Sequence, residues 1–380
     1  MGEPVDVYYF TDAVGYGGAE KSLLNLIAGL DRSRWRPTLV YHEDVGIARL
    51  IAGASRLDCA LWAVPRMPEG MEGARQALPL ALALRRRQPA VFHAHLTWSR
   101  ACKFGLMAAL LARVPAVVAT EHAFVDLPVT RSSRLQMHLM AKGTGRYIAV
   151  SAHIRRCLME TFDRPAERIV VIPNGVEVES YATGVDPELR ARFSDGERRR
   201  VVLALSRLDP RKGLGVLLRA MAELPDMRLV VAGEGFERDQ LGLLAHQLDI
   251  EDRVDLLGYR EDVPRLLACC DVFVQPSLNE AFGLGALEAM CASRPVIASD
   301  VGGTPELVTH GVTGTLVPAG DSAALAAAIR HVLADQGPTA TMVQAARRLA
   351  DSYSLQHMTD AVTDLYEELL STHAGGTPSG

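Results

Sequence analysis

The sequence predicts an α/β fold in which parallel sheets are covered by helices and divided between two domains. Short apolar runs typical of buried strands alternate with stretches of helical spacing along most of the 380 residues, as expected for parallel sheets. A chain of this length exceeds one average domain. Residues 177–200 combine mixed charge with weak periodicity, which predicts a linker between two runs of alternating elements. We therefore predict a first domain over residues 1–176 and, with that stretch as its entry, a second over residues 177–352.

Composition is typical of a globular enzyme, with 48% hydrophobic and 22% charged residues. The net charge of −5 is unevenly placed: residues 1–180 hold 22 Lys and Arg against 17 Asp and Glu, and residues 181–380 hold 18 against 28. The first half is therefore expected to meet any anionic partner, and a nucleic acid is not among the partners expected.

Cysteine usage and the N-terminal residues predict a cytoplasmic protein. The six cysteines are scattered, without Cys-x-x-Cys or Cys/His ligand spacing, which predicts reduced thiols. The first residues lead directly into an apolar strand without a signal-peptide pattern. No apolar run reaches the roughly 18 residues that span a bilayer.

The first domain opens with a strand over residues 5–10 and a helix over residues 21–30, joined by a glycine-rich turn. Backbone N–H groups in such a turn suit phosphate, so Gly17 and Gly18 are candidate phosphate contacts. A dinucleotide-binding dehydrogenase would show Gly-x-Gly-x-x-Gly. Here the two glycines are adjacent and Glu20 occupies the last position, so that alternative is poorly matched.

Histidines mark the ends of two later strands of this domain. His122 follows a strand over residues 116–120, and ligands of parallel sheets bind outside the carboxyl ends of strands, which makes His122 an active-site candidate. His93 and His95 form a His-x-His pair that could hold a metal. Without a third ligand nearby, a partly buried histidine whose hydrogen bonds are satisfied is preferred, and no metal is expected. Further predicted elements of this domain are strands at 38–42, 91–95, 147–150 and 169–172, and helices at 77–87 and 103–111.

A basic stretch, residues 131–156, carries six basic side chains interleaved with leucine and methionine. No acidic residue lies between Asp126 and Glu160. Such a stretch suits anionic lipid or an anionic acceptor, while a solvated basic helix is the slightly favoured alternative. Peripheral contact with the inner face of the plasma membrane is therefore one hypothesis.

The second domain contains two basic side chains, Arg207 and Lys212, on either side of a strand-to-helix turn. Such a pair neutralises a diphosphate leaving group without a metal, and the chain has no Asp-x-Asp. Tyr259 and Arg260 follow another strand, where a nucleobase would rest. The predicted strands are 201–206, 228–232, 254–257, 271–275, 295–298 and 314–317; the predicted helices are 214–222, 238–248, 284–290, 321–334, 341–350 and 353–370.

Two carboxylates flank a predicted phosphate site in the stretch Glu280–Glu288. Glu280 lies in a strand-to-helix loop, and Gly283 and Gly285 lie where the helix begins. Unpaired N–H groups at that helix start suit phosphate, and the glycines allow close approach. Glu288 lies about 7.5 Å further along the helix axis, roughly the reach from a diphosphate to a ribose. The spacing indicates a nucleotide-diphosphate-sugar site, although a parallel sheet with two unrelated glutamates is a comparably good explanation of this stretch alone.

With these motifs combined, the chain resembles the retaining glycosyltransferases of family 4, and the likeness covers nearly its whole length. The seven residues between Glu280 and Glu288 match the family's Glu-x7-Glu motif. The resemblance implies the GT-B fold, two Rossmann-like domains facing each other across a cleft. The other matching residues are Gly17-Gly18-Ala19-Glu20, His122, Ile172-Pro-Asn-Gly-Val176, Ser206-Arg207-Leu-Asp-Pro-Arg-Lys212-Gly213, Val231-Ala-Gly-Glu-Gly235 and Pro276-Ser-Leu-Asn-Glu280.

The resemblance also implies roles for individual residues. Arg207 and Lys212 are expected on the diphosphate, Glu280 on the donor sugar and Glu288 on the ribose. Phe282, Gly283 and Leu284 are expected to supply backbone contacts. Gly17 and Gly18 are expected near the phosphates and His122 near the donor sugar, while helix 353–370 is expected to pack back on the acceptor-side first domain.

The implied reaction is transfer of a hexose from a nucleotide-diphosphate sugar to a hydroxyl acceptor, with retention of anomeric configuration and without cofactor or metal. Uridine diphosphate is the donor carrier expected from family frequency. The product would be a glycan, a glycolipid or a natural product. Two alternatives stay open: a hydrolysing nucleotide-sugar epimerase of the same fold, and a nucleotide-sugar-binding protein without turnover.

Overall fold

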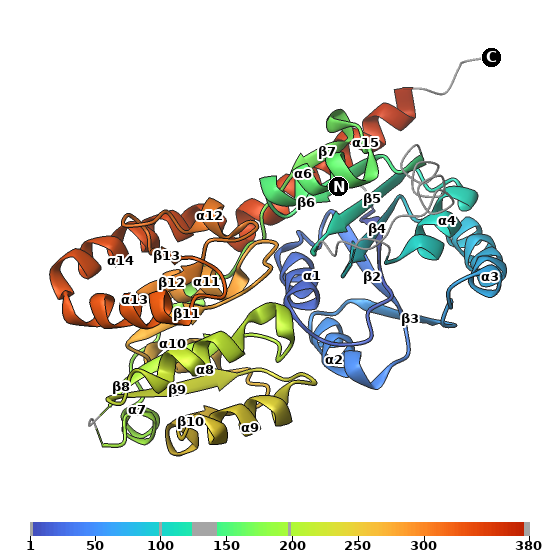
Figure 1. Cartoon of the computed structure of the whole chain (residues 1–380). Coiled ribbons are helices and arrows are strands. Elements are labelled where there is room, and N and C mark those ends of the chain that lie inside the picture. The colour runs from blue at the N-terminus through green and yellow to red at the C-terminus, as the bar shows by residue number, and fades with distance from the viewer. Residues whose placement is uncertain (1–2, 99–100, 124–142, 197–198, 376–380) are drawn as a thin grey trace, which may run out of the picture. The chain divides into compact units, whose positions relative to one another are not determined.

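The computed structural model describes residues 3–98, 101–123, 143–196 and 199–375 (Figure 1). The chain divides into two compact units. The first comprises Met1–Gly175 together with Leu355–Gly380, and the second comprises Val176–Ser354. The chain therefore leaves the first unit, completes the second, and returns to the first through its last helix.

The described residues of the first unit form a seven-stranded sheet in the order β3-β2-β1-β4-β5-β6-β7. Every pair of neighbouring strands is parallel, so the carboxyl ends of the strands share one edge. The strands are β1 Val5–Thr11, β2 Trp35–His42, β3 Ala60–Val64, β4 Val91–Leu96, β5 Ala116–Glu121, β6 Arg146–Ala149 and β7 Ile169–Val171.

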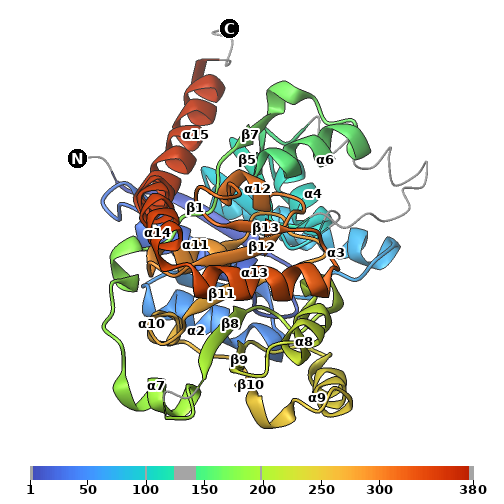
Figure 2. The same cartoon turned by 60° about the vertical axis from the view of Figure 1, so that its left-hand side comes forward.

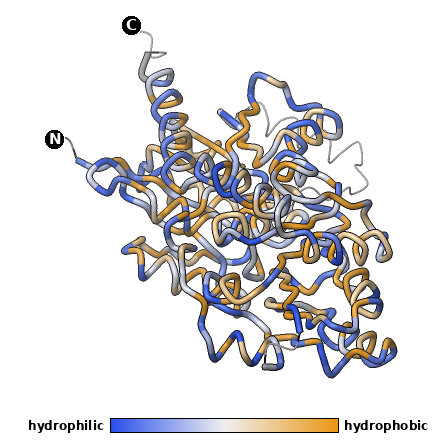
Figure 3. Tube along the Cα trace, turned by 90° about the vertical axis from the view of Figure 1, so that its left-hand side faces the viewer, coloured by the Kyte–Doolittle hydropathy of each residue, from blue (hydrophilic) through white to orange (hydrophobic). Residues whose placement is uncertain are grey.

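The last helix, α15 (Leu355–Gly375), supplies part of the first unit's core. Its buried residues Met358, Val362, Leu365 and Tyr366 join the cluster formed by β1, β2 and α1, and its trace alternates between hydrophobic and hydrophilic residues (Figure 3). This amphipathic spacing explains the return of the chain, because the apolar stripe needs a core to cover it. The other helices are α1 Gly18–Gly29, α2 Ala48–Arg56, α3 Met71–Arg87, α4 Lys103–Ala112 and α6 Ala152–Phe162.

The described residues of the second unit form a six-stranded parallel sheet in the order β10-β9-β8-β11-β12-β13. The strands are β8 Arg200–Leu205, β9 Met227–Ala232, β10 Val254–Leu256, β11 Val272–Gln275, β12 Val296–Ser299 and β13 Thr315–Val317. The helices are α7 Pro187–Phe193, α8 Leu214–Ala222, α9 Arg238–Gln247, α10 Val263–Ala268, α11 Leu284–Cys291, α12 Thr304–Leu307, α13 Ser322–Ala334 and α14 Gln336–Ala350.

Helices cover this second sheet on both faces. Apolar residues of α8, α9 and α13 share one core cluster with the strands, and α13 lies over β11 (Figure 2). Helices α10 and α11 instead contact the short helix η3, Val178–Tyr181. The parallel order with alternating helices confirms the predicted α/β class. Among the described residues, none of the helices has the length and apolarity required to cross a membrane.

Several segments differ from the sequence prediction. Strand β3 and helices α2 and α10 were not predicted, and residues 177–200 are not a simple linker. That stretch contains η3 and α7, both in the second unit. Helix α7 begins after Asp186, whose carboxylate accepts a hydrogen bond from Leu189 N at 2.9 Å. A helix of seven residues is only marginally stable in isolation. Helix α7 is therefore expected to depend on a contact with a residue that is distant in sequence.

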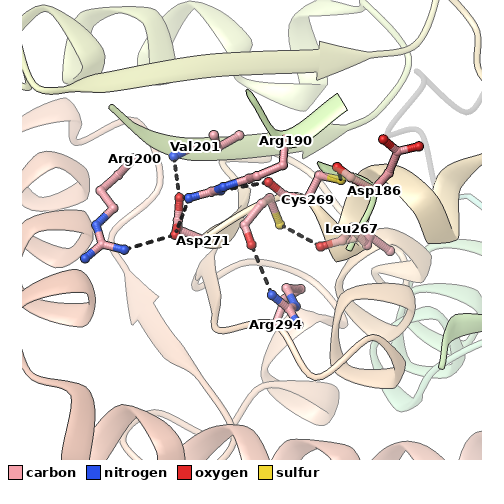
Figure 4. Close-up of polar contacts among 9 residues, drawn as sticks. Asp186, Arg190, Arg200, Val201, Leu267, Cys269, Asp271 and Arg294 are labelled. Carbon is pink, nitrogen blue, oxygen red and sulfur yellow. Dashed lines mark hydrogen bonds and ion pairs between the residues drawn. The ribbon is translucent and has the colours of Figure 1, made fainter. Parts of the chain in front are cut away.

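That contact is a charge network around Asp271, at the end of the second sheet where β8 and β11 begin (Figure 4). Arg190 of α7 donates two hydrogen bonds to the Asp271 carboxylate, at 2.8 and 3.0 Å. Val201 N and Arg200 donate to the same carboxylate at 2.7 and 3.2 Å. Because the Asp271 side chain is only 14% exposed, loss of its partners would leave a largely buried charge.

We expect Asp271→Ala to destabilise the second unit by about 2–4 kcal/mol, because Arg190 and Val201 N lose a mostly buried partner. Urea unfolding followed by circular dichroism measures this. The matched control is Glu223→Ala, which removes a carboxylate that is 47% exposed and 3.6 Å from Arg330; its cost should stay within about 0.5 kcal/mol. Equal costs for the two variants would contradict the importance of the Asp271 network.

Candidate functional site

The candidate site lies at the carboxyl edge of the second sheet, where three loops meet at close backbone distance. An ideal Cβ on Gly213 would lie 2.0 Å from the carbonyl oxygen of Pro276, and one on Gly302 would lie 1.9 Å from the carbonyl oxygen of Glu280. Leu278 N also donates to the carbonyl of Arg211 at 2.7 Å. The glycines therefore allow the loops after β8, β11 and β12 to touch, and these contacts fix the backbone at Glu280.

Helix α11 begins at the end of the loop after β11, next to the contacts between the three loops. Gly283 precedes its first residue with a φ of +102°, a conformation that favours glycine. An ideal Cβ there would lie 3.0 Å from Nε2 of Gln275, the buried last residue of β11. Gly285 lies over Phe273, with its ideal Cβ 3.1 Å from the ring. Helix α11 thus begins in a tightly packed loop at the predicted position, and the use of its first N–H groups for phosphate stays a prediction.

Lys212 and Glu280 form an ion pair. Lys212 Nζ lies 2.8 Å from Glu280 Oε2, and the Ser277 hydroxyl donates to the same oxygen at 2.9 Å. The side chains of Lys212 and Glu280 are 26% and 11% exposed, so the pair is partly desolvated. The sequence prediction placed both residues at one site, with Lys212 on the diphosphate and Glu280 on the donor sugar. It did not predict that the two side chains pair directly.

The two arginines of this loop differ in their environment: Arg211 forms an ion pair, whereas Arg207 is exposed. Arg211, which was not a predicted site residue, binds the carboxylate of buried Asp209 through Nε at 3.0 Å and Nη2 at 2.6 Å. Asp209 also accepts from Arg211 N at 3.0 Å, so it caps the short turn that carries Lys212. Arg207 is exposed at the start of the same loop. A proline directly after Asp209 is the sequence signal that could have revealed this cap.

Glu288 lies in the second turn of α11, on the same helix as the phosphate candidate Gly283. Glu288 is only 4% exposed. Burial and the nearby Glu288 carboxylate raise the pKa of the buried Tyr181. Phe282 is buried beside the ring of Tyr353, with centroids 5.8 Å apart. The backbone contact of Phe282 with a ligand, expected from the resemblance, stays a prediction.

Tyr259 and Arg260 lie in the loop after β10. Tyr259 N donates to Glu234 Oε1 at 3.4 Å. Arg260 makes a two-point ion pair with Asp262, at 2.7 and 2.6 Å. Among the described residues, the hydrogen bonds and ion pairs of Arg260 are with this neighbour and not with Lys212 or Glu280. The predicted nucleobase position thus stays a prediction.

Three predicted residues belong to the first unit. Gly17 and Gly18 lie where α1 begins, and Glu20 Oε2 accepts a hydrogen bond from Gly17 N at 2.7 Å. Glu20, the residue that broke the dinucleotide pattern, thus stabilises this helix start. His122 follows β5 and is 9% exposed.

Two histidines pair at this edge of the first sheet. His122 Nε2 lies 2.9 Å from His95 Nδ1. Burial lowers the pKa of His122 to about 4 and the pKa of His95 well below its usual value. Both rings are therefore neutral near pH 7, and His122 is suited to hydrogen bonding and not to carrying a positive charge.

His93 has a structural environment, in agreement with the preferred interpretation of the His-x-His pair. Its Nδ1 lies 2.5 Å from the Tyr366 hydroxyl of α15, and its Nε2 lies 2.7 Å from Thr120 Oγ1. These contacts join β4, β5 and α15 in the first unit. Within the described part of the chain, no group of three or more His, Cys, Asp or Glu side chains is arranged to hold a metal ion.

Most of the basic stretch 131–156 lies outside the described residues. In its described part, Arg146 pairs with Glu368 of α15 at 2.7 Å and donates to the carbonyl of Gly145. Arg156 is exposed on α6. The Arg146 contact is an internal ion pair that the sequence pattern did not reveal.

Two protein families match successive parts of the chain. Residues 16–180 match the family described as Glycosyltransferase Family 4, and residues 185–349 match the family described as Glycosyl transferases group 1. The boundary between the two matches falls near the division of the structure into two units.

Curated relatives match over part of their length. A D-inositol 3-phosphate glycosyltransferase of Mycobacterium sp. (strain JLS) is 38% identical over 204 residues, which is 52% of this chain and 46% of the relative. An uncharacterized glycosyltransferase of Methanocaldococcus jannaschii is 31% identical over 232 residues, 58% of this chain and 59% of the relative. The chain thus spans about half the length of the curated relatives it matches.

Solved structures match over nearly the whole chain. Anabaena Alr3699/HepE in complex with UDP has a TM-score of 0.80 at 24% identity, covering 96% of this chain and all of that one (100%). A glycosyltransferase from Rickettsia africae has a TM-score of 0.82 at 21% identity, covering 97% and 99%. Sucrose-phosphate synthase from Thermosynechococcus elongatus has a TM-score of 0.79 at 20% identity, covering 97% and 100%. At these identities the likeness shows a shared fold.

We expect Gly213→Ala to destabilise the second unit more than Gly311→Ala. Both glycines have positive φ, +65° and +73°, so both variants carry a similar backbone strain of about 1–2 kcal/mol. In the described structure the added Cβ at Gly311 meets no atom within 4 Å, whereas at Gly213 it collides with the Pro276 carbonyl. A further loss of about 1–3 kcal/mol is expected at Gly213, measured by urea unfolding. Equal losses would contradict the tight junction.

We expect the first unit to show two opposite pH dependences of stability. His93 and His122 have pKa values of about 3 and 4 in the fold against 6.5 when unfolded, so the unfolded chain takes up protons and stability falls as pH drops below 6.5. Burial raises the pKa of Glu121 from 4.5 to about 8, so its contribution is present at low pH and is lost as pH rises toward 8.

Glu121→Gln tests the second dependence. Between about pH 6.5 and 8 the thermal midpoint of the wild type should fall, because the unfolded chain has released the Glu121 proton that the folded chain retains. The glutamine variant should show a flatter profile there and a steeper loss between about pH 6.5 and 4.5, where Glu121 no longer offsets the histidines. An identical slope in both proteins above pH 6.5 would mean that Glu121 is ionised in the folded chain.

Proposed function

We propose that this chain, which belongs to the family 4 glycosyltransferases and has the GT-B fold, transfers a hexose from a nucleotide-diphosphate sugar to a hydroxyl acceptor. The observation that carries the proposal is the gathering of Lys212, Glu280 and the start of α11 at one edge of the second sheet, with Glu288 further along the same helix. The second unit would bind the donor and the first unit the acceptor.

The start of α11 supports the diphosphate part of the proposal. Unpaired N–H groups and the helix dipole favour an anion there, and Gly283 has the positive φ that keeps the backbone open to a ligand. Lys212 lies on the neighbouring loop, and Arg207 begins that loop. Two cations near a diphosphate stabilise the negative charge that develops as it leaves. This arrangement supports transfer without a metal or cofactor.

The ion pair between Lys212 and Glu280 supports a specific binding sequence. A diphosphate offers Lys212 more negative charge than one carboxylate does. We therefore propose that Lys212 moves from Glu280 to the diphosphate, which leaves Glu280 to accept hydrogen bonds from sugar hydroxyls. Ser277, which donates to the same Glu280 oxygen at 2.9 Å, would keep the carboxylate oriented after Lys212 has left.

Transfer with retention of configuration is the finer proposal. In a front-side displacement the bond from the anomeric carbon to the diphosphate oxygen breaks, the acceptor oxygen forms the new bond on the same face, and the diphosphate takes the acceptor's proton. The protein would contribute positioning and stabilisation of the leaving group. Neutral His122 would serve as a hydrogen-bond partner for a substrate, and Gly17 and Gly18 as backbone contacts to phosphate.

We propose UDP as the donor carrier and an anionic acceptor. The Anabaena relative of similar fold was crystallised with UDP, which supports UDP. The first half of the chain holds 22 basic against 17 acidic residues, and the mycobacterial relatives are named for a phosphorylated acceptor; both support an anionic acceptor. Cytoplasmic location and contact of residues 131–156 with an anionic membrane belong to the same proposal. The epimerase and the binding protein without turnover are not favoured, because the similar curated proteins carry glycosyltransferase names.

Calorimetric titration of UDP, GDP and ADP in the presence of EDTA tests the donor site. We expect UDP to bind without metal, and Glu288→Ala to weaken that binding at least about tenfold, because a charged hydrogen bond to the ribose is lost. The matched control is Glu261→Ala, an exposed carboxylate of the same unit, which should leave the affinity unchanged. Absence of binding for all three nucleotides, or equal effects of the two variants, would overturn the proposed donor site.

A further inference from the structure

His95 lies near the end of β4 and contacts the ring of His122, the candidate substrate contact of the first unit. Strands β4 and β5 are parallel neighbours, and His122 N donates to the carbonyl of Leu96 at 3.0 Å. This backbone bond continues the pairing of the two strands beyond the end of β5. The sheet itself therefore holds the side chains of His95 and His122 as neighbours.

The two imidazole rings meet through one nitrogen each. His95 Nδ1 lies 2.9 Å from His122 Nε2, the ring centroids are 5.2 Å apart and the ring planes differ by 21°. Such a distance between two ring nitrogens is that of a hydrogen bond, which requires one proton between them. Burial keeps the pKa of both rings below the usual value. Both rings are therefore neutral near pH 7, and each has one donor and one acceptor nitrogen.

The second nitrogen of His95 indicates which ring donates. His95 Nε2 is buried and has no hydrogen-bond partner in the part of the chain that the structure describes. If His95 accepted at Nδ1, its single proton would lie on Nε2 as a buried N–H without an acceptor. A buried N–H without an acceptor is rarer in folded proteins than a buried acceptor without a donor. The favoured arrangement therefore places the His95 proton on Nδ1, which donates it to His122 Nε2.

This hydrogen bond determines both the tautomer and the orientation of His122. Because Nε2 of His122 accepts, the single proton of its neutral ring lies on Nδ1. No residue of the described ranges accepts a hydrogen bond from that nitrogen. A ring turned over about its Cβ–Cγ bond would lose the bond to His95 and would place a carbon where Nδ1 had been. The contact with His95 thus makes Nδ1–H the donor that His122 has available for a ligand.

We infer that His95 is a positioning residue that holds His122 in the Nδ1–H form, so that His122 donates a hydrogen bond to a hydroxyl oxygen of the transferred sugar. The inference rests on the proposed function, which supplies the sugar. In this form His122 cannot act as a base at Nδ1, since a nitrogen that carries the proton cannot take one from the acceptor hydroxyl. That proton would go to the leaving diphosphate, as in the front-side displacement proposed above.

Nuclear magnetic resonance of protein labelled with ¹⁵N-histidine tests the hydrogen bond without any ligand. Near pH 7 we expect the proton on Nδ1 of both His95 and His122, and a scalar coupling across the hydrogen bond between His95 Nδ1 and His122 Nε2. Signals are assigned by their loss in His95→Asn and in His122→Gln. The tautomers are measured in the wild type itself, and a proton on Nε2 of His122 would overturn the inference.

Calorimetry with UDP and UDP-glucose tests the role toward the sugar. His95→Leu removes the donor that fixes His122, so we expect the dissociation constant of UDP-glucose to rise about threefold, the scale of one neutral hydrogen bond. UDP carries no transferable hexose and should bind both proteins within about a factor of two. His95→Asn should restore most of the affinity for UDP-glucose, because its amide N–H can donate to His122 Nε2.

The matched control is His93→Leu, which removes the other buried histidine of β4. In the described structure the two ring nitrogens of His93 contact Tyr366 and Thr120. This variant should lose thermal stability and keep the wild-type preference for UDP-glucose over UDP. Thermal unfolding of all variants reports general losses of stability, which do not distinguish between the two ligands.

The outcomes separate the inference from the proposed function. If the wild type binds UDP but His95→Leu weakens UDP and UDP-glucose equally, or weakens neither, the positioning role is wrong while the donor site stands. A selective loss that His95→Asn does not restore would also contradict the hydrogen bond as its cause. If the wild type binds neither ligand, the proposed donor is wrong and the inference is overturned with it. Selective loss for UDP-glucose with recovery in His95→Asn supports both.

Discussion

The candidate site depends on close contact between the backbones of three loops at one edge of the second sheet. The carbonyls of Pro276 and Glu280 lie so near Gly213 and Gly302 that a Cβ on either glycine would overlap them, at 2.0 and 1.9 Å. These contacts hold the loop after β11 on both sides. That loop positions both the carboxylate of Glu280 and the first turn of α11. Because the loop is fixed by its backbone contacts, both groups are held in place.

Strand β11 is held at its other end by a different kind of interaction. Asp271, which directly precedes the strand, binds Arg190 of α7 and the backbone of Val201 at the start of β8. Charge thus fixes the beginning of the strand, and backbone packing of glycine fixes the loop that follows it. The stabilising network of Asp271 therefore lies where β8 and β11 begin, and the candidate-site pair Lys212–Glu280 lies at the opposite, carboxyl edge of the sheet. In the proposed function this separation would keep the charges of the site available for a ligand.

The alternation of apolar runs and amphipathic stretches predicted most strands and helices of both units, because those periodicities are local. Strand β3 was not predicted although its sequence, Ala-Leu-Trp-Ala-Val, is apolar throughout; most of its residues are not buried in the fold. Helix α7 depends on the pairing of Arg190 with Asp271, 81 positions away. The same limit applies to the site. Glycines and carboxylates at fixed spacing could be identified from the sequence, whereas the Lys212–Glu280 pair joins residues that are distant in sequence.

The Lys212–Glu280 pair indicates why such a site would select a diphosphate. Each of the two partly buried charges is balanced by the other, and Ser277 also donates to Glu280, so neither Lys212 nor Glu280 lacks a partner. A neutral ligand that separated the pair would leave both charges with fewer partners at a cost in free energy. In the proposed function a diphosphate would replace Glu280 as the partner of Lys212, and the attached sugar hydroxyls would replace Lys212 as partners of Glu280. A free sugar would offer Lys212 no anionic partner, so the ion pair would disfavour it relative to a nucleotide-diphosphate sugar.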